Sequence, residues 1–62
     1  MFTFEDMQNH IHIWEVNKGF YLSHENEKKL VSFYNINEVI NYLYLNGFKQ
    51  TARNIHAKNK SI

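Results

Sequence analysis

Three histidines are the residues with the most obvious capacity to bind a metal. His10 and His12 lie two positions apart in a segment whose alternation predicts a strand, so their side chains share one face. His24, in the next predicted strand, is expected opposite His12. Three imidazoles so placed could hold zinc or nickel, but no carboxylate shares that face to orient them. We therefore predict neither a bound metal nor a cofactor. If a metal is bound, these three histidines are the candidate ligands.

Basic side chains gather near the C-terminus. Residues 1–48 carry three lysines and six acids, a net charge of −3, whereas residues 49–62 carry four cations and no acid, a net charge of +4. Lys49, Arg53, His56 and Lys60 recur at a spacing that places them on one helical face. Such a face could contact the phosphates of a nucleic acid or an acidic protein. A solvated face of cations near a helix C-terminus is the simpler interpretation.

The sequence lacks the residue patterns of common catalytic sites. It contains no cysteine, which excludes thiol nucleophiles, disulfides and cysteine-based zinc sites. It has neither a glycine-rich phosphate loop nor a convincing pair of carboxylates. Ser23 and His24 are neighbours in a predicted strand, so their side chains point to opposite faces. We therefore predict a protein that is not an enzyme.

Residues 10–34 are predicted to form a three-stranded antiparallel β-meander. A period-two alternation of side chains up to Val16 predicts the first strand, and two further strands are expected at 20–24 and 28–34. Between the first two strands, residues 17–19 predict a three-residue turn with Gly19 in the left-handed conformation. This turn places Val16 opposite Phe20 and so sets the predicted register. Residues 1–9 have two interpretations, a helical turn that closes over the sheet as a lid or an added edge strand.

Residues 35–58 are predicted to be helical. Asn35 and Glu38 have the spacing of a helix N-cap, and Gly47 is expected to end the first helix in the left-handed conformation. A second helix or a kinked continuation follows, because apolar residues recur at Phe48, Ala52 and Ile55. The predicted fold class is α+β, a single small domain over 1–62 in which the meander packs against a C-terminal helix kinked or broken near Gly47.

The predicted sheet carries apolar side chains on both faces, which one short helix cannot cover. We place the helix on the face of Ile11 and Ile13, because that face is the more uniformly apolar. The other face then needs cover from residues 1–9, from the C-terminal helix or from another protein. Large apolar groups dominate the energy of protein interfaces, so the predicted interface residues are Trp14, Phe20, Leu22 and Tyr34.

These patterns favour a small, non-catalytic protein that acts by binding protein, either by forming a homodimer or by docking on a target. A regulatory or accessory role is expected, and nine asparagines with six lysines to one arginine fit an AT-rich genome such as that of a phage. The alternative is a nucleic-acid-binding module that uses the basic C-terminal helix face. We expect a cytoplasmic protein with no membrane contact, because no apolar run approaches the roughly 18 residues of a span.

Overall fold

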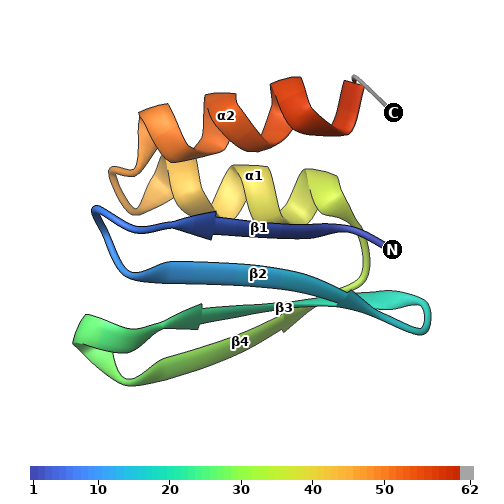
Figure 1. The fold of residues 1–62 in the computed structure, drawn as a ribbon, viewed down its shortest axis with the longest axis horizontal. Helices are drawn as coiled ribbons and strands as arrows, with labels where there is room; N and C mark the ends of the chain where they lie inside the picture. The colour runs from blue at the N-terminus through green and yellow to red at the C-terminus, as the bar shows by residue number, and fades with distance from the viewer. Residues whose placement is uncertain (61–62) are drawn as a thin grey trace.

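Alternating apolar residues fold into an antiparallel sheet that two helices cover on one face (Figure 1). The computed structural model describes residues 1–60. The sheet has the strand order β1-β2-β3-β4, and the elements are β1 (Thr3–Asp6), β2 (Ile11–Val16), β3 (Gly19–His24), the short 3-10 turn η1 (Glu25–Glu27), β4 (Lys29–Phe33), α1 (Ile36–Leu45) and α2 (Lys49–Lys60). The α+β class is therefore confirmed. Neither helix is long and apolar enough to cross a bilayer within the described residues.

The N-terminal residues add a fourth strand to the predicted three. β1 pairs antiparallel with β2, and Phe4 lies opposite Ile13. Phe2 is only 5% exposed and Phe4 packs against the core, both on the face that the helices cover. Met7 is 73% exposed in the turn after β1. The lid interpretation of residues 1–9 is thus wrong, and the edge-strand interpretation is correct.

The register between β2 and β3 differs by one residue from the predicted register. The connecting loop has two residues, with Asn17 in the left-handed conformation (φ 55°), and Val16 pairs with Gly19. We had predicted a three-residue loop with Val16 opposite Phe20. Because side chains alternate along a strand, a shift of one residue exchanges the two faces of β3. Phe20 and Leu22 therefore lie under the helices.

The core lies between one face of the sheet and the helix pair. Its buried side chains come from β2, β3 and both helices, together with the residue that precedes β1: Phe2, Ile11, Ile13, Leu22, Val39, Leu43, Ala52 and Ile55. Val31 and Phe33 of β4 are half-buried at its margin. The two outer strands, β1 and β4, are thus less enclosed by the core than β2 and β3.

The start of α1 is fixed by the predicted cap. The Asn35 side chain accepts a hydrogen bond from the Glu38 amide (3.0 Å). The Glu38 carboxylate accepts one from the Tyr34 amide (2.7 Å), one residue before the position that a standard capping box uses. Both residues that precede the helix, Tyr34 and Asn35, are therefore hydrogen-bonded to Glu38 in its first turn.

Gly47 separates the two helices. It has φ 88°, and its amide donates to the Tyr44 carbonyl while the Phe48 amide donates to the Leu43 carbonyl (3.2 and 2.8 Å). These two bonds define a Schellman motif, which satisfies the free carbonyls at the end of a helix. The chain then turns back, and α2 runs antiparallel beside α1 (Figure 1).

α2 is attached to the outer strand β1 by polar contacts. The buried Thr51 hydroxyl donates to the Asp6 carboxylate (2.5 Å), and Lys58 donates to the Thr3 carbonyl. Burial raises the pKa of the Asp6 carboxyl, but the hydrogen bonds from Thr51 and Asn9 lower it by more, so the pKa lies below its ordinary value. The charged form of Asp6 thus stabilises the contact between β1 and α2.

We predict that Gly47→Ala lowers the free energy of unfolding by about 1–2 kcal/mol, because an L-residue is strained in the left-handed region. No atom lies within 4 Å of the added Cβ, so crowding contributes nothing. Gly47→Asn should lose less, since asparagine tolerates this conformation. Urea unfolding of the three proteins measures the difference, and equal stability of the alanine variant and the wild type would contradict the assignment.

The lowered pKa of Asp6 makes part of the stability dependent on pH. Charged Asp6 makes its full contribution to the free energy of unfolding above the ordinary carboxyl pKa near 3.8. This contribution is lost as the pH falls through the lower pKa of the folded state. Between about pH 6 and about pH 3, wild type should therefore lose more stability than Asp6→Asn. Urea unfolding at both pH values tests this, with Glu5→Gln as the control for a neighbouring exposed carboxyl. If Asp6→Asn shows the same loss as wild type, Asp6 is not the group responsible.

Candidate functional site

The three histidines are not brought together. His12 pairs with Ser23, and His24 pairs with Ile11, so the predicted pairing of His12 with His24 is wrong. His24 is buried on the helix-covered face with its ring 5.2 Å from that of Phe48, whereas His12 is exposed on the opposite face. Within residues 1–60 no group of three His, Asp or Glu side chains could hold a metal ion. The one-residue register shift separates them.

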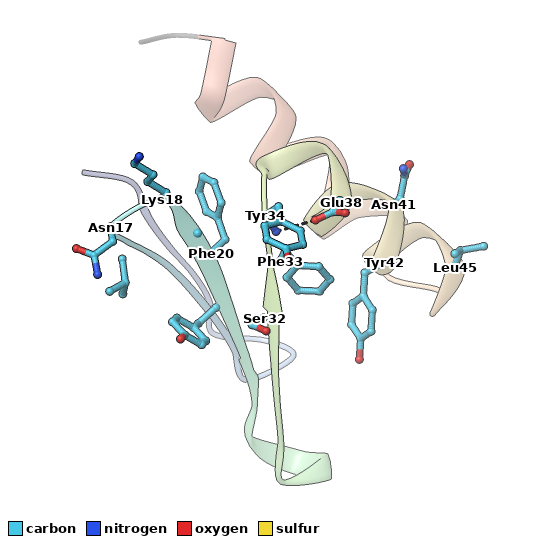
Figure 2. A pocket seen from close by; sticks show the side chains of 13 residues that line it. Asn17, Lys18, Phe20, Ser32, Phe33, Tyr34, Glu38, Asn41, Tyr42 and Leu45 are labelled. Atoms are coloured by element: carbon cyan, nitrogen blue, oxygen red, sulfur yellow. Dashed lines mark hydrogen bonds between the residues drawn. The ribbon is translucent and has the colours of Figure 1, made fainter.

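A groove of about 750 Å³ lies between the β2–β3 loop, the end of β4 and α1 (Figure 2). We call it the hairpin groove. Tyr34 is 84% exposed and Leu45 is 87% exposed, so large apolar groups at this groove meet water. Five of the thirteen residues that line it are aromatic, and its large apolar side chains include Phe20, Tyr21, Phe33, Tyr34, Tyr42 and Leu45.

α1 supplies one wall of the hairpin groove through a second stripe of side chains. Glu38, Asn41, Tyr42 and Leu45 recur at i, i+3, i+4 and i+7, so they lie along one side of the helix. The Tyr42 ring packs against Phe33 of β4 at 5.4 Å. Figure 2 shows Tyr42 and Leu45 projecting from α1 on the side of β4 away from β3. This stripe is distinct from the buried stripe that holds α1 to the sheet.

β4 is an edge strand whose outer side has no partner within the described residues. Its side chain Leu30 is 65% exposed. The other edge, β1, is partly covered because Lys58 of α2 donates to the outward carbonyl of Thr3. The helix pair thus protects one edge of the sheet and leaves the other open beside the hairpin groove.

The four predicted interface residues occupy three different environments. Phe20 and Tyr34 line the hairpin groove. Leu22 is 1% exposed in the core, so it is not accessible to a partner. Trp14 is half-buried on the face opposite the helices, where its ring stacks on Tyr21 at 5.7 Å. The prediction placed Phe20 and Leu22 beside Trp14, and the corrected register moves them to the other face.

The face opposite the helices is less apolar than expected. Trp14, Val16, Tyr21 and Leu30 lie on it, and they alternate across the strands with polar side chains. His12 closes one end of the aromatic cluster, with its ring 5.1 Å from Trp14. Neither Phe2 nor Phe4 covers this face, because both lie on the helix side. The face therefore remains solvated and bears one small aromatic cluster.

A second groove of about 580 Å³ follows the line where α1 and α2 meet, and we call it the helix groove. Arg53, His56 and Lys60 line it from α2, as the basic stripe predicts. Lys49 belongs to the same predicted stripe but does not line the groove. The opposite wall, which the sequence analysis missed, comes from α1 and contains Asn37, Asn41 and Tyr44.

Residues of α1 were missed in both grooves. Asn37, Ile40, Asn41 and Tyr44 repeat at i, i+3, i+4 and i+7, and so does the stripe that ends at Leu45. These periodicities are visible in the sequence. They become informative only when the position of α2 is known, because α2 determines which sides of α1 stay accessible.

Comparisons of the chain with models of protein families, with curated proteins and with solved structures found no match.

Proposed function

We propose that this protein is a small protein-binding accessory domain and that its partner is a second copy of the same chain. The supporting observation is the unpaired edge of β4 beside the exposed apolar stripe of α1. In this arrangement β4 of each copy pairs antiparallel, and the two sheets become one. The protein then acts by binding and not by catalysis.

The backbone groups available for this pairing can be identified from the hydrogen bonds of the sheet. The Glu15 amide donates to the Phe2 carbonyl (2.9 Å), so the backbone of Glu15 faces β1 and that of Trp14 faces β3. Because this direction alternates along an antiparallel strand, it can be followed across the sheet through the observed register. On β4 the amide and carbonyl groups that face outward belong to Leu30 and Ser32.

A two-fold axis at Val31 matches these groups with each other. Leu30 of each copy then lies opposite Ser32 of the other, and each such pair exchanges two hydrogen bonds. The pairing ends there because the next amide on each side is already bonded within its own chain. The Lys28 amide donates to the Glu25 carbonyl, and the Tyr34 amide donates to the Glu38 carboxylate. The edge is therefore self-complementary over a short, defined length.

The charges on β4 favour this antiparallel pairing. Lys28 and Lys29 precede its centre, and Phe33 and Tyr34 follow it. A two-fold axis places the lysines of one copy opposite the aromatic residues of the other, where cations interact favourably with aromatic rings. Parallel pairing would instead bring the lysines of both copies together, which is unfavourable. The symmetric arrangement thus avoids repulsion between like charges.

Four hydrogen bonds alone would give a weak dimer, because each contributes only about 1 kcal/mol net. The α1 stripe supplies apolar area beside them. In the paired sheet the α1 helices of the two copies lie on the same face, adjacent across the axis, so that Leu45 and Tyr42 become shielded from water. This accounts for the exposure of Leu45 in the single chain.

We predict that light scattering gives twice the chain mass of 7.5 kDa for wild type at high concentration. Ser32→Pro should give 7.5 kDa at every concentration, because proline removes an outward amide and blocks pairing. The fold should persist, since proline is compatible with the outward-facing positions of an edge strand. Circular dichroism confirms folding.

Glu5→Pro is the matched control. The same alternation places the Glu5 amide on the outer side of β1, so this variant blocks the opposite edge and should remain dimeric. Leu45→Ser should weaken dimerisation about ten-fold or more, whereas Met7→Ser, at an exposed site far from β4, should not. A monomeric wild type, or a dimer lost in Glu5→Pro and kept in Ser32→Pro, would overturn the proposal.

A further inference from the structure

Within residues 1–60, the basic side chains that line the helix groove have no acidic partner. Arg53, His56 and Lys60 are exposed along one wall, and within residues 1–60 no carboxylate lies within 4.0 Å of any of them. α2 contains no acidic residue, and the single acid of α1, Glu38, is bonded to the Tyr34 amide in the hairpin groove. The wall is thus positively charged and available to an anionic ligand.

The facing wall adds an aromatic ring and two amides. Tyr44 is exposed, and the side chains of Asn37 and Asn41 are exposed beside it. Because the helices run antiparallel (Figure 1), the end of α1 that carries Tyr44 lies toward Arg53, and the end that carries Asn37 lies toward Lys60. An accessible ring, amide groups and cations therefore line the same groove.

We propose that the helix groove binds single-stranded nucleic acid. A base stacks on Tyr44, since every base offers a flat face to an aromatic ring. The asparagine amides supply donors and acceptors for base edges. Arg53 and Lys60 are seven residues apart, about 10 Å along the helix axis, so they contact separate phosphates of one strand.

Two other anionic ligands fit the groove less well. In a duplex the faces of the bases are stacked on each other, so Tyr44 would have no base face to stack on. An acidic peptide would satisfy the cations but offers no planar group for the ring. The combination of ring and cations is what selects a single strand.

Fluorescence anisotropy of a labelled oligothymidine with the full chain tests the proposal. We expect the affinity to fall with added salt, with a slope of log K against log salt of about −1.4 for two phosphate contacts on a single strand. Arg53→Gln should reduce this slope by about 0.7, and Tyr44→Ala should weaken binding about ten-fold. Circular dichroism of each variant verifies that it is folded.

Each variant has a control of the same type. Lys49→Gln removes a cation of α2 outside the groove, and Tyr34→Ala removes an exposed tyrosine from the hairpin groove. Both should bind oligothymidine within about two-fold of wild type, since neither residue contacts the ligand in this arrangement. On wild type, amide NMR shifts with oligothymidine should concentrate on the facing sides of α1 and α2.

The proposal is overturned if Tyr44→Ala and Tyr34→Ala bind equally, or if the NMR shifts map to the sheet. It is also overturned if polyglutamate competes as well as unlabelled oligothymidine at equal charge, which would indicate an acidic protein ligand, or if duplex DNA binds as tightly. Ser32→Pro separates this site from the proposed dimer, because a monomer with an intact helix groove should still bind the oligonucleotide.

Discussion

The two-residue loop between β2 and β3 determines which side chains enter the core. With Val16 paired to Gly19, Ile13 lies opposite Leu22, and both point toward the helices. One more loop residue would turn Leu22 to solvent and bring Ser23 inward, which a chain of this size could not tolerate because its core is small. Asn17 makes the short loop possible, since asparagine accepts the left-handed conformation at little cost.

The helix pair contacts the two edges of the sheet in different ways. α2 lies along β1, where Thr51 and Lys58 bond to its polar groups. α1 lies toward β4 but makes no comparable bond to the middle of that strand within the described residues. An exposed strand edge tends to pair with another strand, so within the described residues this asymmetry leaves β4 as the edge open to pairing.

Much of the fold could be predicted from local signals. Asn35 with Glu38 begins α1 and Gly47 ends it, because caps depend on a few neighbouring residues. Two features depended on tertiary context. β1 is only four residues long and is stabilised by pairing with β2 and by α2, so its own sequence is a weak signal. The loop length between β2 and β3 was decided by burial of Leu22, because Gly19 alone fits either turn.

The candidate sites also divide into residues that local sequence predicts and residues whose position depends on tertiary context. The basic residues of the helix groove were found because the helical period alone places Arg53, His56 and Lys60 on one face of α2. The predicted interface depended on the β3 register and therefore placed Leu22 on the wrong face. Tyr44 and Leu45 were missed because their exposure depends on where α2 crosses α1.

Asn41 belongs to the walls of both grooves. The hairpin groove and the helix groove lie on either side of α1. If Asn41 shifts when one groove is occupied, the shape of the other groove changes. Thermodynamic linkage then requires reciprocity: if assembly of two chains alters affinity for a polyanion by some factor, the polyanion alters assembly by the same factor. If both grooves are occupied as proposed, the Asn41 amide is the side chain common to the two sites.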